Sequence, residues 1–329
     1  MKRSIAIAAL AGLLAAILLI GYHGFLAVSD LLLAVGWGML VVGAYHLIPL
    51  TFSSLAWRRV VRNTWRKPLP VFIWARLVRE AVGSLLPVMQ VGGELVGARI
   101  LTFRGAVAGI AGASVIVDLT LEAVAQFFFT LLGLVLLVLI GGSEETVRWT
   151  AAGLAVGALA LGGFVMAQHH GMFKFLEDFI EKIAEKWDWL SLGRIGNVHD
   201  TIQKLYRERR ALLAAGLTHL FSWIISAGEV WLALYFMGSP VTFLEALILE
   251  SLSHAVKSAA FMVPGALGVQ EGTYMLLVQM FGLTPEMGLA LSLVKRARDL
   301  LLGIPTLLGW QMQESGRLWI RANRAKSEN

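Results

Sequence analysis

The sequence has no cysteine and few charged residues. Without cysteine, the chain cannot form disulfides, thiolate zinc sites or cysteine nucleophiles. Only 15% of the 329 residues are charged, whereas a soluble domain has roughly 25%. The sequence also lacks the Walker, HExxH and GxSxG motifs of nucleotide-binding proteins, zinc hydrolases and serine hydrolases. These absences argue against a soluble enzyme and against ATP as a direct energy source.

What the chain has in excess is apolar sequence in long runs. Hydrophobic residues make up 57% of the chain. A helix of about 20 apolar residues is long enough to span a bilayer. Runs of this kind cover about 4–25, 31–56, 106–140, 147–167, 211–237 and 286–310. The sequence therefore predicts an all-α polytopic membrane protein, with residues 1–329 forming a single integral membrane domain.

Loop charge predicts the orientation of this domain. Basic residues gather between Arg58 and Lys67, between Arg207 and Arg210, and in the tail between Arg317 and Lys326. The intervening turns, at 141–145, 238–240 and 282–286, are poor in lysine and arginine. Because basic loops stay in the cytoplasm, both termini are predicted to be cytoplasmic in a bacterial inner membrane. No small-x-small site follows the first run, so a retained helix is favoured there over a cleaved signal peptide.

Two further apolar stretches, about 70–104 and 241–283, are broken by proline and glycine. Six full spans place both termini on the cytoplasmic side only if each broken stretch enters and leaves the membrane on the same side. Broken backbone at membrane depth is tolerated where protein or a water-filled cavity surrounds it. The predicted fold is therefore about six transmembrane helices plus two re-entrant helical hairpins.

The two broken stretches resemble each other. In both, a glutamate follows a proline by seven residues, and the two motifs are 177 residues apart. Proline ends an incoming helix and glycine permits the turn, while the next helix presents N-terminal amides that favour an anion. The hairpin motif consists of Pro87, Gly92, Gly93 and Glu94, and of Pro264, Gly265, Gly268, Glu271 and Gly272. We expect an inverted repeat, which in transporters marks the central site. The alternative is a coincidence between two kinked helices.

The repeat divides the domain into a first half, 1–170, and a second half, 211–310. Between them, 172–208 combines an apolar stripe with interspersed charges, which predicts a cytoplasmic amphipathic connector. This connector is also the segment that would serve as a docking surface if the protein were a scaffold.

Ionisable residues inside the apolar runs are the candidate site. Each costs about 2.5–3.5 kcal/mol at the bilayer centre on insertion scales, so a group of them requires a reason. One interpretation is a polar cavity for a lipid headgroup, and another is salt bridges that only hold broken helices together. A third is that Asp118 and Glu122 relay protons. The histidines have no metal-ligand spacing, so no metal or cofactor is predicted. The candidate residues are Arg79, Glu94, Arg99, Asp118, Glu122, Lys257, Glu271, Arg296 and Arg298.

These motifs resemble the membrane-region family of lysylphosphatidylglycerol synthases, a flippase-like family. The resemblance rests on 86–99, on 263–272 and on Arg298 ahead of Pro305. The segment 92–99 is most similar to the hopanoid-biosynthesis-associated subgroup. Many relatives have an arginine where this chain has Gly97, which leaves the substrate open. The resemblance assigns family positions to Pro87, Gly93, Glu94, Pro264, Gly265, Gly268, Glu271, Gly272 and Arg298.

The resemblance implies an inner-membrane protein that moves or handles lipids, hopanoids in particular. We therefore expect a lipid transporter that acts on a hopanoid or a polar-headgroup lipid and is not an enzyme. The aminoacyl-transferase domain of the synthases is not expected, since the chain ends soon after the last run. Alternatives are a scaffold for lipid-synthesis enzymes and a membrane enzyme acting on lipid or polyprenyl substrates. Membrane lipids are the expected partners, with lipid-biosynthesis enzymes as further candidates; nucleic acid is not expected, and the oligomeric state is open.

Overall fold

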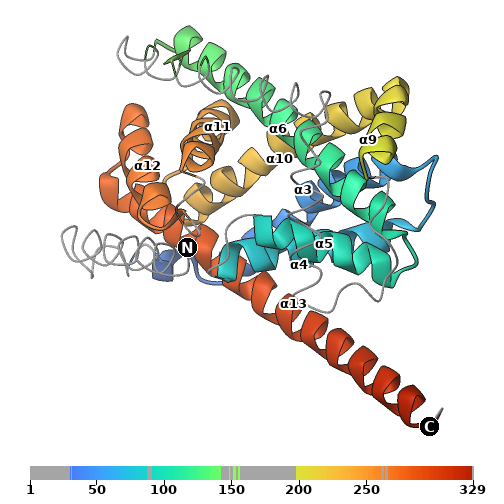
Figure 1. Ribbon diagram of the computed structural model, residues 1–329. Coiled ribbons are helices and arrows are strands. Elements are labelled where there is room, and N and C mark those ends of the chain that lie inside the picture. The colour runs from blue at the N-terminus through green and yellow to red at the C-terminus, as the bar shows by residue number, and fades with distance from the viewer. Residues whose placement is uncertain are drawn as a thin grey trace.

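A computed structural model describes residues 30, 32–86, 91–141, 148, 151, 152, 155, 198–260, 263 and 266–327, with the backbone alone at 91 and 316–327. Every regular element in this part of the chain is a helix, so the predicted all-α class is confirmed for it (Figure 1). The elements are α3 (Gly38–Val61), α4 (Leu69–Leu85), α5 (Val91–Phe103), α6 (Ala108–Leu139), α9 (Val198–Arg207), α10 (Arg209–Phe236), α11 (Phe243–Ala259), α12 (Val269–Leu277), the 3₁₀ helix η3 (Val278–Phe281) and α13 (Pro285–Ser327).

Three of the described helices, α3, α6 and α10, are long and apolar enough to cross a membrane. They correspond to the predicted runs 31–56, 106–140 and 211–237. The predicted run 286–310 lies within α13, which also has Lys295, Arg296, Arg298 and Asp299 in that part. The runs 4–25 and, for the most part, 147–167 lie outside the described residues. The count of six spans therefore stays a prediction.

Helices α3 and α10 pack against each other through small residues. Ser53 Oγ and Ser222 Oγ are 3.0 Å apart across the contact, and both side chains are buried. A Cβ atom at Gly228 would lie 2.1 Å from Tyr45 Oη, so only glycine permits this approach. Small interfacial residues let helix backbones come close in a membrane, where apolar burial does not drive helices together.

Both broken stretches form a helix, a break and a second helix. In the first, α4 ends at Leu85 and Leu86 is extended, as expected for a residue that precedes a proline. The chain resumes as α5 three residues before Glu94. In the second, α11 ends at Ala259, and α12 begins two residues before Glu271. The prediction that the outgoing helix begins near the glutamate is confirmed in both, whereas re-entry from one side stays a prediction.

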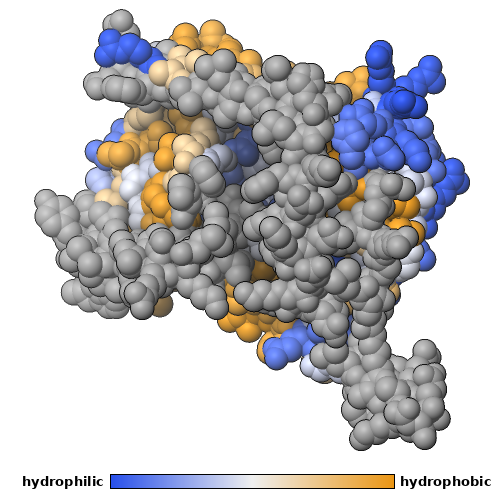
Figure 2. Space-filling view, viewed as in Figure 1, coloured by the Kyte–Doolittle hydropathy of each residue, from blue (hydrophilic) through white to orange (hydrophobic). Residues whose placement is uncertain are grey.

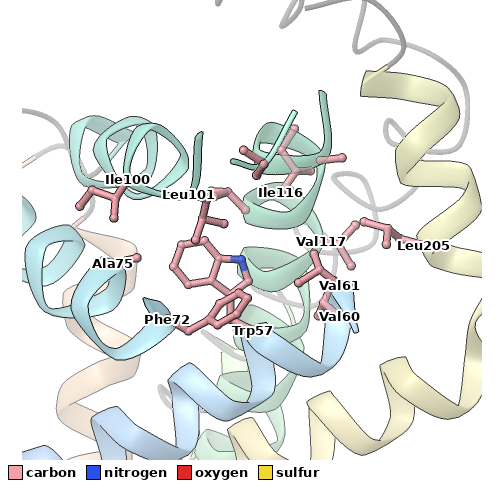
Figure 3. Packing of buried hydrophobic residues seen from close by; sticks show 14 of the residues in the cluster. Trp57, Val60, Val61, Phe72, Ala75, Ile100, Leu101, Ile116, Val117 and Leu205 are labelled. Atoms are coloured by element: carbon pink, nitrogen blue, oxygen red, sulfur yellow. The ribbon is translucent and has the colours of Figure 1, made fainter. Parts of the chain in front are cut away.

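Helix α9 is the described part of the predicted connector, because 172–197 lies outside the described residues. It is amphipathic: Val198, Ile202 and Leu205 are buried, while Asp200 and Lys204 are exposed. Figure 3 shows Leu205 on the edge of the core that surrounds Trp57 and Phe72. Hydrophilic residues gather at the end of the molecule where α9 lies (Figure 2). The basic ends of α3 and α10 meet there too, since Asn63 Nδ2 donates to Glu208 Oε2 at 2.9 Å.

Helix α13 is the longest described element, with 43 residues, and its C-terminal end extends away from the bundle (Figure 1). It packs against α12 at one end and α4 further along. Trp74 Nε1 on α4 donates to Gln313 Oε1 at 3.1 Å, and Arg99 on α5 pairs with Glu314. One helix therefore contacts both broken stretches.

Candidate functional site

Two buried arginines of α4 hold two carboxylates of α6. Arg76 Nη1 donates to Asp118 Oδ2 at 3.2 Å, and Arg79 Nη1 donates to the same oxygen at 2.9 Å. Arg79 Nη2 donates to Glu122 Oε2 at 3.0 Å, and Arg76 also pairs with Glu122. Residues three or four apart lie on one helix face, so each helix presents both of its charges to the other.

Glu94 and His219 extend this group to α5 and α10. Arg79 Nε donates to Glu94 Oε1 at 2.7 Å. The other oxygen, Glu94 Oε2, is buried 2.6 Å from the same nitrogen but has no hydrogen bond among the described residues. His219 Nε2 lies 2.9 Å from Asp118 Oδ1, and neither side chain has any exposed surface. Glu94, at the first helix break, is thus joined to α6 and α10 through Arg79 and Asp118.

Glu80 connects this group to a second one, which contains His46 of α3. Arg76 Nε donates to Glu80 Oε1 at 3.2 Å, and Glu80 Oε2 lies 3.1 Å from His46 Nε2. The other ring nitrogen, His46 Nδ1, lies 2.6 Å from Glu229 Oε1 of α10. Arg298 of α13 donates through Nη1 to Glu229 Oε2 at 2.9 Å and also contacts His46. Six helices contribute side chains to these two groups.

A third group lies between α11, α12 and α13. Lys295 Nζ is 2.6 Å from both oxygens of Glu250, and both side chains are buried. Tyr274 Oη donates to Glu250 Oε2 at 2.7 Å, and His254 Nε2 lies 3.1 Å from Glu250 Oε1. Three donors therefore share this one carboxylate.

Glu271, at the second helix break, caps the helix that follows. The backbone N–H of Gly268 donates to Glu271 Oε2 at 2.8 Å, and Arg296 of α13 pairs with the same carboxylate. Ser292 Oγ donates to Glu271 Oε1 at 3.3 Å. Gly268 has a φ of +77°, which glycine adopts without strain. The start of α12 therefore interacts with the protein's own carboxylate, in agreement with the expectation that an anion is favoured there.

A small cavity lies beside the second group. Its volume is about 20 Å³, and the ionisable residues in its lining are His46, Glu80, Arg298 and Asp299. A space of this size holds about one water molecule, which requires several polar partners. The network therefore has a place where a single water could exchange hydrogen bonds with a histidine, two carboxylates and a guanidinium.

The structure brings together only some of the predicted site residues. Arg79, Glu94, Asp118 and Glu122 form one group, and Arg296 pairs with Glu271. Arg99 pairs with Glu314 of α13.

Lys257 has no ion pair among the described residues. Gly92 and Gly93 lie in the first turn of α5, and Gly272 lies inside α12. Pro87, Pro264 and Gly265 fall outside the described residues.

Several residues of the network were not among the candidates. Arg76 lies three residues before Arg79, and that helical spacing would have identified it. His46 and His219 were set aside because they have no metal-ligand spacing, although each pairs with carboxylates. An ionisable side chain inside an apolar helix was the available signal. The other omitted members are Glu80, Glu229, Glu250, His254, Tyr274 and Lys295.

Comparison with known proteins adds the family. The family model described as the lysylphosphatidylglycerol synthase TM region matches residues 4–309, which is most of the chain. The protein belongs to this family. The UPF0104 membrane protein of Pyrococcus horikoshii is a relative, 32% identical over 133 residues. That match covers 39% of this chain and 36% of the relative, so the chain spans about a third of the relative's length. No solved structure matches this protein, residues 1–329.

Proposed function

We propose that this protein moves a lipid with a polar headgroup, such as a hopanoid derivative, across or within the membrane. The observation that most supports this is the continuity of the charged network. Ion pairs lead from Glu94 through Arg79, Asp118, Arg76 and Glu80 to His46, and through Glu229 to Arg298. Arg296, two residues before Arg298 on α13, pairs with Glu271. Charged side chains thus lead from the first helix break to α13, the helix that also pairs with the second break.

Many charged side chains lie inside this largely apolar domain. Each costs about 2.5–3.5 kcal/mol at the bilayer centre on insertion scales, and groups of this kind commonly mark substrate or ion pathways. A buried ion pair adds little net stability over a well-packed apolar pair. Structural support alone is therefore a weak reason for the network, whereas a path for a headgroup requires polar groups that can exchange partners.

The lengths of the broken helices favour re-entrant hairpins. Helices α4 and α11 each have 17 residues, about 25 Å of helix, which is less than the roughly 30 Å of a bilayer core. The following limbs are shorter still. Entry of the two hairpins from opposite sides would make them an inverted repeat around a central site.

The expectations from the sequence about activity, location, partners and orientation are part of this proposal. The protein would act without enzymatic chemistry, in a bacterial inner membrane, with membrane lipids as its partners and both termini in the cytoplasm. The basic ends of α3 and α10 lie together, which supports a common side for them. The connector 172–208 would then lie on the cytoplasmic face, between the halves 1–170 and 211–310.

The test is lipid movement by purified protein in liposomes, with labelled phospholipid and labelled hopanoid as separate probes. Glu94→Gln and Glu271→Gln remove the carboxylate at each break and are expected to abolish movement. Glu314→Gln is the matched control, because it also removes an arginine–glutamate pair but lies outside the network. It is expected to leave movement unchanged.

Two outcomes would contradict the proposal. Equal lipid movement by wild type, Glu94→Gln and Glu271→Gln would show that these carboxylates do not contribute to the path of the lipid. Wild-type protein that is folded and reconstituted but moves neither probe would favour the scaffold alternative. Each variant is first compared with wild type by size-exclusion chromatography and thermal unfolding in detergent.

A further inference from the structure

A groove lies between α3 and α10, apart from the charged network. Its volume is about 390 Å³, within the range of roughly 300–1,000 Å³ that is usual for ligand sites. The walls are mostly apolar, and the rings of Phe52 and Phe221 pack edge to face with their centroids 5.0 Å apart. The lining residues are Phe52, Leu55, Arg59, Ala214, Leu217, Thr218 and Phe221.

Arg59 is the charged residue of the groove, and its bonding is incomplete. Its Nη1 atom donates to the carbonyl oxygen of Ala214 at 3.1 Å and to Thr218 Oγ1. Its Nε and Nη2 atoms have no hydrogen-bond partner among the described residues, and no described carboxylate lies within ion-pair distance. The arginines of the network, by contrast, each pair with at least one carboxylate. The half-buried Arg59 guanidinium is therefore fixed at one nitrogen and free to bind an anion at the others.

The surroundings of the groove favour a lipid over a soluble anion. Along α10, Leu213, Leu217 and Phe221 are four residues apart and are 66%, 59% and 49% exposed. Because α3 and α10 are long and apolar enough to cross a membrane, this stripe would contact acyl chains.

Arg59 lies at the basic end of α3, beside Arg58, and close to the start of α10 with Arg209 and Arg210. An anionic headgroup is attracted to such a position by about 1 kcal/mol per basic residue near the surface.

We propose that the α3/α10 groove binds one anionic phospholipid of the bilayer. Its phosphate contacts Nε and Nη2 of Arg59, and one acyl chain follows Leu55, Phe52 and Phe221 away from the basic end. Guanidinium groups suit phosphate because they offer planar, paired donors. This site goes beyond the proposed transport function, because the network side chains are absent from the groove and the bound lipid does not need to be the one that is moved.

The experiment measures lipid selectivity directly. Full-length protein is reconstituted in phosphatidylcholine bilayers with a minority of phosphatidylglycerol, and spin-labelled analogues of both lipids report the fraction immobilised on the protein. Wild type is expected to prefer phosphatidylglycerol. Arg59→Gln is expected to lower that preference about fivefold, the equivalent of roughly 1 kcal/mol for one basic residue. Arg66→Gln is the matched control, because Arg66 is exposed and donates to its own helix end at Arg62.

A second variant tests the groove itself. Ala214→Trp fills the groove without removing a charge and is expected to lower the immobilised fraction of phosphatidylglycerol. If Arg59→Gln does not fold, this variant still decides the question. Equal selectivity in wild type and Arg59→Gln, or an equal loss in Arg66→Gln, would overturn the proposal in favour of diffuse attraction to the basic end. Unchanged binding in Ala214→Trp would overturn it as well. None of these readouts depends on lipid movement, so a failure of the transport proposal remains distinguishable.

Discussion

The two helix-break-helix elements share a sequence pattern but differ in how their charges are bonded. In the first, two arginines of α4 each contact three carboxylates, and two of these carboxylates are shared. In the second, Lys295 has Glu250 and Arg296 has Glu271 as ion-pair partners. The first is a shared cluster with more carboxylates than guanidinium groups, whereas the second consists of separate pairs.

The glutamates at the breaks show the same difference. Glu94 accepts from Arg79, which belongs to α4, the helix that precedes the same break. Glu271 accepts from the N–H of Gly268 and from Arg296 on a different helix. In both elements a glutamate thus lies at the start of the second helix, while its partners differ. The similarity is limited to the course of the backbone, and each element uses its carboxylate differently.

The largest expected effect comes from removing one shared arginine. Arg76→Met leaves Glu80 with one partner fewer, leaves Glu122 to Arg79 alone, and leaves Asp118 to Arg79 and His219. Unpairing buried charges typically costs about 3–5 kcal/mol, so we expect a loss of that order in the free energy of unfolding. Lys295→Met is expected to cost less, because Tyr274 and His254 still donate to Glu250. Thermal unfolding in detergent compares the two variants; an equal loss would abolish the distinction between cluster and pairs.

A smaller effect is expected within the second element. Tyr274→Phe removes a hydrogen bond to the buried Glu250 carboxylate but keeps the ring and the Lys295 pair. Hydrogen bonds to charged groups contribute about 1.5–3 kcal/mol, which sets the expected loss. Tyr235→Phe is the control, because the Tyr235 side chain is mostly exposed. The same unfolding measurement decides, and equal losses in both variants would show that the Tyr274 hydroxyl does not stabilise the group.

The smallest expected effects on the free energy of unfolding come from replacing one motif glycine in each element. A Cβ atom at Gly93 would lie 2.4 Å from the carbonyl oxygen of Arg79, so Gly93→Ala is expected to destabilise by about 1–3 kcal/mol. At Gly272 a Cβ atom meets nothing within 4 Å. Since alanine favours helix over glycine by about 0.5–1 kcal/mol, Gly272→Ala is expected to stabilise. Unfolding shifts of the same sign in both would contradict the difference in packing.

The sequence predicted the course of the chain better than its contacts. Apolar runs and the two proline–glutamate motifs located α6, α10 and both broken stretches to within about two residues, and α3 to within about seven, because each is a local signal. The pairing of Arg76 with Asp118 joins positions 42 residues apart, and that of His46 with Glu229 joins positions 183 apart. Those contacts depend on how helices pack, which apolar periodicity does not specify. His46 and His219 have no metal-ligand spacing, and local spacing does not reveal that their partners are carboxylates on other helices.

The length of α13 has a mechanical consequence. Its 43 residues make a rod of about 65 Å, roughly twice the thickness of a bilayer core. The rod is held at one place by Glu271 through Arg296 and at another by Trp74 and Arg99 through Gln313 and Glu314. Pro305 lies between these attachments and lacks the amide that would complete the helix there, so bending is easiest at that point. Helix α13 therefore ties the two broken stretches to one continuous helix, with its most easily bent point between the two attachments.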